Sequence, residues 1–207
     1  MVQHFKKKIG IMGGTFNPIH NGHLILAESA YEQFHLDSVI FLPSGNPPHK
    51  DNISYIDAEA RCKMVELAIH DNIHFSISYD EVNRPGVTYT ADTLREMRRK
   101  EPYTDYYFII GADSLFTFET WHQPEKICQY CSILVATREG HDSNMVEHKI
   151  SELRKKYKCD IFRIISPDFD ISSKLIRERI AAKRSVKYFV PELVGDYIRR
   201  HEIYKDF

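Results

Sequence analysis

Residues 13–24 read GGTFNPIHNGHL, a glycine-rich stretch in which His20 and His23 are separated by Asn-Gly. An apolar run at residues 9–12 precedes it, and residues 24–30 (LILAESA) follow with the pattern of a helix. A glycine-rich turn between a strand and a helix brings main-chain N–H groups and the positive end of the helix dipole to an anion, usually a phosphate. The stretch therefore predicts a phosphate site after the first strand.

Two familiar phosphate motifs are excluded at this position. No Gly-Lys-Ser/Thr follows the glycines, as a Walker A loop requires, and the G-x-G-x-x-G spacing of dinucleotide-binding turns is absent. The sequence instead indicates a third kind of phosphate site, in which imidazole side chains add donors beside the main chain.

Apolar runs alternate with helical patterns along the chain. We expect strands at 8–12, 38–42, 75–78, 106–110, 132–136 and 161–164, and helices at 22–34, 57–70, 90–100, 124–129, 143–157, 172–182 and 191–200. This alternation favours parallel βαβ units with helices on both faces of a sheet. The prediction is an α/β, Rossmann-like, doubly wound parallel sheet that forms one domain over residues 1–207, with 166–207 as a small C-terminal helical subregion.

Three candidate segments follow expected strands: the glycine-rich stretch, Gly111-Ala112-Asp113, and Thr137-Arg138. Ligands of doubly wound sheets bind beyond the carboxyl ends of the strands, near the point where the strand order reverses. We therefore expect these segments to converge on one edge of the sheet.

The composition of the chain limits the kinds of binding partner and cellular location that we expect. The 207 residues include 28 basic and 29 acidic side chains, so the net charge of −1 predicts no general field for nucleic acid. No apolar run reaches the roughly 20 residues of a membrane span, and the N-terminus lacks the apolar stretch of a signal peptide, so we expect a cytoplasmic protein. Cys128 and Cys131 have C-x-x-C spacing but no second pair, which favours buried thiols over a metal site.

Further motifs carry a family resemblance. Residues 13–23 resemble the T/HxGH signature of the nucleotidyltransferase superfamily, and residues 171–177 (ISSKLIR) resemble its ISSTxxR motif. Together with residues 111–115 (GADSL), Trp121 and residues 47–50 (PPHK), they make essentially the whole chain similar to the bacterial nicotinate-nucleotide adenylyltransferase family. Lys174 departs from the family, which usually has threonine there, so no role of that hydroxyl is carried over.

The resemblance implies transfer of AMP from ATP to nicotinic acid mononucleotide, which gives deamido-NAD and pyrophosphate, with Mg²⁺ bound to ATP and no metal ligands from the protein. The attacking phosphate is already ionised near neutral pH and requires no general base. Catalysis then consists of aligning the reactants and countering charge on the phosphates. The residues expected to do this are His20, His23 and Arg177.

The resemblance also implies two subsites. For ATP the expected residues are Gly13, Gly14, Thr15, Phe16, His20, His23, Gly111, Asp113, Ser172, Ser173 and Arg177. For the acceptor they are Lys50, Thr88, Thr90, Trp121 and Arg138, with Trp121 stacked on the pyridine ring and the main chain of 88–90 meeting the nicotinate carboxylate.

Structural interpretations of several of these residues remain open. The histidines, the serines and Asp113 could serve only as caps of helices or strands, and Trp121 could serve only in packing. Zinc binding by the two histidines is disfavoured because a third protein ligand is lacking nearby.

Two other functions remain open. One is another small-substrate nucleotidyltransferase, such as phosphopantetheine adenylyltransferase, and the other is a non-catalytic nucleotide-sensing module. The expected partners are ATP and nicotinic acid mononucleotide, without nucleic acid or membrane, and a homodimer is left open.

Overall fold

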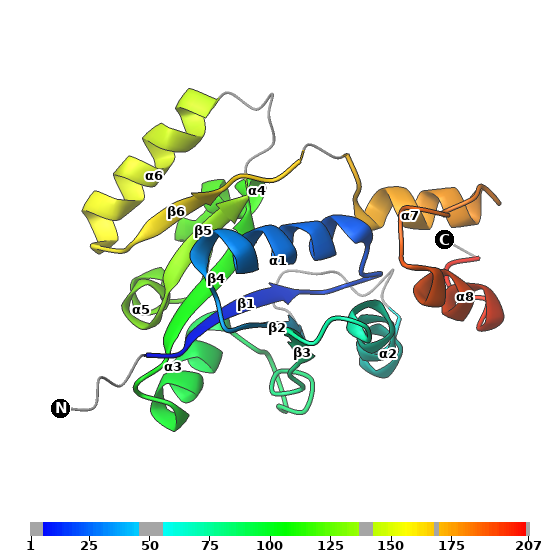
Figure 1. The fold of residues 1–207 in the computed structure, drawn as a ribbon, viewed down its shortest axis with the longest axis horizontal. Coiled ribbons are helices and arrows are strands. Elements are labelled where there is room, and N and C mark those ends of the chain that lie inside the picture. The colour runs from blue at the N-terminus through cyan, green and yellow to red at the C-terminus, as the bar shows by residue number, and fades with distance from the viewer. Residues whose placement is uncertain (1–5, 46–55, 137–142, 168–169, 206–207) are drawn as a thin grey trace.

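The computed structural model describes residues 6–45, 56–136, 143–167 and 170–205. Within them, a six-stranded sheet has the order β3-β2-β1-β4-β5-β6, and every neighbouring pair is parallel (Figure 1). The strands are β1 (Lys8–Gly14), β2 (Ser38–Pro43), β3 (Phe75–Ile77), β4 (Asp105–Gly111), β5 (Ser132–Ala136) and β6 (Ile161–Ile164). The Rossmann-like fold class expected from the sequence is confirmed.

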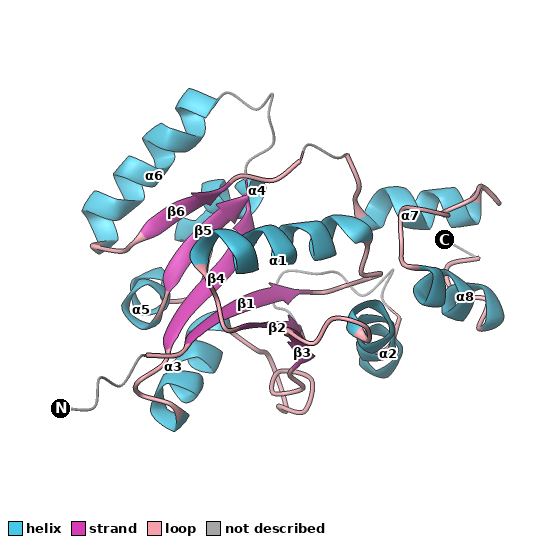
Figure 2. Ribbon diagram, viewed as in Figure 1, coloured by secondary structure: helices cyan, strands magenta, loops and turns pink. Residues whose placement is uncertain are grey.

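Helices cover both faces of the sheet (Figure 2). They are α1 (Asn21–Phe34), α2 (Ala58–Ile69), α3 (Thr90–Lys100), α4 (Ala112–Thr117), α5 (Pro124–Tyr130), α6 (Ser143–Tyr157), α7 (Ser173–Ala181) and α8 (Glu192–Arg200), with a 3₁₀ turn η1 (Phe118–Thr120). One core cluster joins the sheet to α3, α4, α5 and α6, and a second joins it to α1, α2, α7 and α8.

The strands are buried on both sides, which explains their uninterrupted apolar runs. In β5, Ile133 and Val135 belong to one core cluster and Leu134 to the other, and all three are fully buried. The same alternation separates Phe108 from Ile109 in β4. Successive side chains of a strand point to opposite faces of the sheet. Each of these strands therefore packs against helices on both faces.

The strand order places the glycine-rich stretch at the reversal point of the sheet. The chain passes from β1 outward to β2 and β3, then crosses to β4 on the other side of β1. The carboxyl ends of β1 and β4 are neighbours, with Met12 opposite Ile109. In such sheets the crevice between these two strand ends is where ligands bind.

The expected helices agree with the observed ones to within about two residues, but α4 and η1 were not expected. Residues 112–120 form two very short elements, and neither is long enough to show a helical period. Among the described residues, no helix is long and apolar enough to cross a membrane.

Candidate active site

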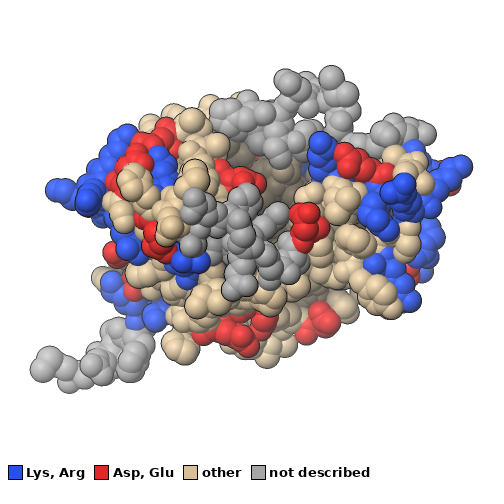
Figure 3. Space-filling model, turned by 90° about the horizontal axis from the view of Figure 1, so that it is seen from above, with Lys and Arg blue, Asp and Glu red and all other residues tan. Residues whose placement is uncertain are grey.

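A pocket of about 370 Å³ opens at the carboxyl ends of β1 and β4. Its lining includes Gly13, His20, His23, Gly111, Asp113, Trp121, Ser172 and Ser173, which come from four separate stretches of the sequence. On the face seen in Figure 3, Lys and Arg side chains gather toward the two ends, and the described surface between them is mainly uncharged or acidic.

The turn between β1 and α1 is tightly built. Phe16 adopts a left-handed backbone conformation (φ 49°) and is 2% exposed, and the Asn17–Pro18 peptide is cis. The ring of Phe16 packs 5.9 Å from that of Phe41 and edge-on to that of His23 at 5.1 Å, measured between ring centroids. Gly14, Thr15 and Phe16 follow Gly13 in the chain but do not line the pocket.

The two histidines lie at the start of α1 and contact each other. The main-chain N–H of His20 donates to Nδ1 of His23 at 3.2 Å, and the ring centroids are 3.7 Å apart. Because Nδ1 of His23 accepts, the proton of the neutral ring lies on Nε2. Burial, with a smaller contribution from His20, lowers the pKa of His23 well below its usual value. His23 is therefore a neutral N–H donor at pH 7.

The start of α7 is joined to the same turn. Ser172 caps the helix, because its Oγ accepts from the main-chain N–H of Leu175 at 3.1 Å. Ser173 donates from Oγ to the carbonyl of Pro18 at 2.8 Å, and Arg177 donates from Nη1 to the carbonyl of Asn17 at 2.7 Å. Both serines thus have structural bonds and also line the pocket, whereas Arg177 does not appear in the lining.

Lys174 lies apart from these contacts. Its side chain is 79% exposed and its Nζ is 3.8 Å from Oε1 of Glu178 one turn on. The residue that departs from the family motif is thus on the solvent side of α7.

Two buried polar residues hold the turn and were not predicted. Arg61, 3% exposed on α2, donates to the carbonyls of Thr15 at 2.7 Å and Ser44 at 2.8 Å. Tyr204 donates from its hydroxyl to Oδ1 of Asn17 at 2.7 Å, and burial raises the pKa of Tyr204. One sequence signal could have revealed Arg61: it occupies the apolar stripe of α2 formed with Met64, Val65 and Ala68.

Trp121 lines the pocket and packs against the core cluster that contains α3, α4, α5 and α6. It is half-buried, with its ring centroid 5.6 Å from that of Phe118 and edge-on to Phe108 at 6.2 Å. Trp121 therefore packs against the core and also lines the cavity.

Thr88 and Thr90 lie outside the lining of the pocket. Thr90 is the first residue of α3, and its N-cap residue Tyr89 supplies no side-chain cap. The ring centroid of Tyr89 lies 4.2 Å from that of His122, next to Trp121, with the two rings tilted by 31°. Thr88 is buried and its hydroxyl donates to Glu81, so only its main chain is available to a ligand.

The other residues expected from the sequence to bind a ligand or a metal do not line this pocket or are not described. Lys50, the 47–50 stretch and Arg138 lie outside the described residues. Within the described parts of the chain, no group of three or more His, Cys, Asp or Glu side chains could hold a metal ion. The four cysteines are free thiols, three of them buried and Cys128 half-buried.

The fold and site define a nucleotidyltransferase, and the Cytidylyltransferase-like family matches residues 11–179. A "Probable nicotinate-nucleotide adenylyltransferase" of Lachnoclostridium phytofermentans is 50% identical over 198 residues, which is 96% of this chain and 99% of that protein. Another of the same name from Thermoanaerobacter sp. is 42% identical over 96% of this chain and 94% of its own. The chain belongs to the nicotinate-nucleotide adenylyltransferase family and is an enzyme.

A solved structure shares the fold. Plasmodium falciparum nicotinic acid mononucleotide adenylyltransferase complexed with NaAD superposes with a TM-score of 0.76 at 19% identity. The match covers 96% of this chain and 97% of that one. At this level of identity the likeness concerns the arrangement of strands and helices.

Proposed function

We propose that this enzyme transfers the AMP moiety of ATP to nicotinic acid mononucleotide, forming deamido-NAD and pyrophosphate in NAD biosynthesis. The observation that carries the proposal is the pocket at the sheet reversal, where His20, His23, Ser172, Ser173 and Trp121 line one cavity. Relatives that match almost the whole chain have this activity in their names. The pocket combines donors for phosphates with an aromatic wall for a base.

The reaction needs alignment more than acid–base chemistry. An oxygen of the acceptor's phosphate attacks the α-phosphorus of ATP, and the bond from that phosphorus to the β-bridging oxygen breaks. The second pKa of a phosphate monoester is about 6, so the attacking oxygen is already unprotonated. Pyrophosphate leaves with the electron pair. The protein's task is to hold the three atoms in line and to counter the charge on the phosphates.

The histidines and the start of α7 would counter that charge. In our proposal the Nε2–H of His23 faces the transferred phosphate, with His20 and the main chain of Gly13 beside it. The N-terminus of α7, with Ser172, Ser173 and Arg177, receives the outer phosphates. The bonds of Ser173 and Arg177 to Pro18 and Asn17 support this arrangement, because they keep the two phosphate-binding segments together.

The acceptor would lie on the side of Trp121. Stacking of the pyridine ring on Trp121 accounts for its place in the lining, and the N–H groups at the start of α3 suit a carboxylate. Gly111 and Asp113 would contact the nucleotide at the end of β4. Lys50 and Arg138 are assigned to the acceptor through the family resemblance alone.

Mg²⁺ would enter with ATP. Asp113 is the one carboxylate among the described residues that line the pocket, and the other polar donors there are hydroxyl, imidazole and main-chain groups. Such a donor set fits a metal held chiefly by the phosphate oxygens of the nucleotide. When bound, the metal neutralises charge on the departing pyrophosphate.

A pyrophosphate-release assay tests the proposal. The enzyme is supplied with ATP and, in turn, nicotinic acid mononucleotide, nicotinamide mononucleotide and phosphopantetheine, with the His23→Ala variant as the inactive control. We expect the highest kcat/KM with nicotinic acid mononucleotide. Preference for phosphopantetheine would assign the chain to a different transfer reaction, and release with none of the three would make it a non-catalytic nucleotide-binding protein.

A further inference from the structure

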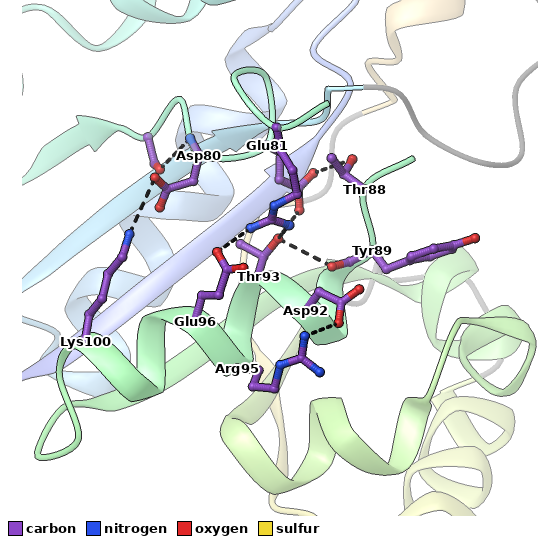
Figure 4. A network of polar contacts seen from close by, with 11 residues as sticks. Asp80, Glu81, Thr88, Tyr89, Asp92, Thr93, Arg95, Glu96 and Lys100 are labelled. Atoms are coloured by element: carbon purple, nitrogen blue, oxygen red, sulfur yellow. Dashed lines mark hydrogen bonds and ion pairs between the residues drawn. The ribbon is translucent and has the colours of Figure 1, made fainter. Parts of the chain in front are cut away.

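A buried carboxylate that the reaction does not use lies beneath the start of α3. Glu81 is 6% exposed, and among the described residues it is the one acidic side chain that is buried. Its two carboxylate oxygens accept hydrogen bonds from Thr93 Oγ1 at 2.9 Å and Thr88 Oγ1 at 3.3 Å (Figure 4). Burying a charged group is costly unless its bonds are satisfied, so this placement calls for a reason.

The basic residue near Glu81 is Arg84, and its hydrogen bonds go to other side chains. Arg84 donates from Nη1 to Thr93 Oγ1 at 2.9 Å and from Nη2 to Glu96 at 2.7 Å. Thr93 thus links the carboxylate of Glu81 to the guanidinium of Arg84. Burial raises the pKa of Glu81, and the two hydroxyls and Arg84 oppose that rise. The network holds together four residues of the 81–93 segment.

The main chain of Glu81 also meets the segment that leaves β2. A Cβ atom on Gly45 would lie 2.1 Å from the carbonyl oxygen of Glu81, so only a glycine allows this approach. Gly45 is the last described residue before 46–55, and its neighbour Ser44 is held by Arg61. On its other side, the Thr88–Thr90 segment touches His122 through Tyr89. Glu81 thus meets Gly45 through its main chain, and through its carboxylate it bonds Thr88 of the segment that the proposed function assigns to the nicotinate group.

We propose that Glu81 is a positioning residue for the acceptor subsite. By accepting from Thr88 and Thr93, its carboxylate fixes the start of α3, and with it the direction of the main-chain N–H groups around Thr90. Because Tyr89 supplies no side-chain cap, a ligand carboxylate is the natural acceptor for those groups. Glu81 thereby determines the preference for an acidic over an amide pyridine nucleotide without touching either. This inference rests on the proposed function.

The test compares Glu81→Gln with Glu96→Gln. Both variants remove one negative charge beside Arg84, but Glu96 is 43% exposed and lies farther along α3. For Glu81→Gln we expect the KM for nicotinic acid mononucleotide to rise about 10-fold, the size of one lost charged hydrogen bond. Its preference over nicotinamide mononucleotide should fall by a similar factor. The KM for ATP should stay within about twofold, and Glu96→Gln should leave all three values within that range.

A second variant tests the same interaction in case Glu81→Gln does not fold. Thr93→Val removes the stronger of the two donors while keeping the shape of the side chain, and it should reproduce the same rise in acceptor KM. In the double variant the two effects should not multiply, because both remove one interaction. Either single variant that folds, as judged by urea unfolding, is sufficient.

The outcomes separate the two proposals. If the wild-type enzyme does not use nicotinic acid mononucleotide, the proposed function fails. If the wild type does use it, any of three results overturns the role of Glu81. The first is an unchanged preference for nicotinic acid mononucleotide in Glu81→Gln, and the second is an equal rise in the KM values for ATP and for the acceptor. The third is that the effects of Glu81→Gln and Thr93→Val multiply in the double variant.

Discussion

The hydroxyl of Tyr204 donates to Oδ1 of Asn17 at 2.7 Å and joins residues 187 positions apart in the sequence. Both residues are buried, at 3% exposure each. Asn17 also accepts at its carbonyl from Arg177. The turn that precedes His20 is thus fixed by α7 and by the chain that follows α8, as well as by its own strand and helix.

Tyr204→Phe should weaken both stability and ATP use. The ring remains, but Oδ1 of Asn17 loses a buried donor, which typically costs about 1–3 kcal/mol. Urea unfolding should show that loss, and the KM for ATP should rise because the turn is less well held. Tyr188→Phe, at a 78% exposed ring, is the control. Equal unfolding free energies for wild type and Tyr204→Phe would contradict the prediction.

His23→Ala should lower kcat much more than it lowers stability. Loss of one donor aimed at developing charge typically reduces kcat by roughly 10²–10³. Steady-state kinetics and thermal unfolding measure the two effects, with His70→Ala at the exposed end of α2 as the control. A folded His23→Ala enzyme that keeps more than about a third of the wild-type kcat would remove His23 from the catalytic group.

The lowered pKa of His23 predicts a dependence of stability on pH. Below the unfolded-state pKa of about 6.5, the unfolded chain binds a proton that the folded chain does not, so the unfolding free energy falls as the pH falls. Between pH 7.5 and 5.5 this contribution amounts to as much as about 1.4 kcal/mol. His23→Gln, which cannot titrate, should lose less stability over that interval. The same slope in both proteins would show that His23 has an ordinary pKa.

Arg177→Lys should impair the use of ATP. Lysine keeps the charge but lacks the planar group that bonds the carbonyl of Asn17 and that, in the proposed arrangement, also bonds a phosphate. We expect the KM for ATP to rise about 10-fold with little change for the acceptor. Arg179→Lys is a matched control, because the guanidinium of Arg179 bonds Ser185 and lies over Phe189. A rise confined to the acceptor KM would place Arg177 in the other subsite.

Trp121→Ala should weaken acceptor binding while ATP binding is retained. Stacking of a base on an aromatic side chain is worth roughly 1–3 kcal/mol, or about 5–150-fold in KM. Both pyridine nucleotides should lose affinity in similar proportion, because stacking does not distinguish a carboxylate from an amide. An unchanged acceptor KM in a folded variant would leave Trp121 with packing against Phe118 alone. Equal use of the two nucleotides by the wild type would contradict the preference for nicotinate.

The sequence predicted those features that repeat or are local. All six strands were expected because apolar runs such as 133–136 are continuous where both faces are covered. The place of the glycine-rich turn between β1 and α1 followed from its glycines and from the strand before it. Two short elements, α4 and η1, were missed because a period of 3.6 cannot be recognised in so few residues.

Residues whose partners are distant in the chain were not predicted. Glu81 belongs to a polar loop in which an acidic residue is unremarkable, and its burial depends on how the end of β2 meets the start of α3. Tyr204 resembles any aromatic residue near a helix, and its bond to Asn17 depends on the docking of α8. Only Arg61 left a sequence signal, as a charge within an apolar stripe.

The long-range hydrogen bonds that hold residues 15–18 also indicate that this turn is completed late in folding. Bonds reach this turn from Arg61, Ser173, Arg177 and Tyr204, across separations of 46, 155, 160 and 187 residues. Contacts that close such long loops form after local ones. A chain with its first strands paired but α7 and α8 undocked would therefore lack a finished nucleotide site. Nucleotide should bind only to the completely folded enzyme, and by mass action it would then raise the free energy of global unfolding.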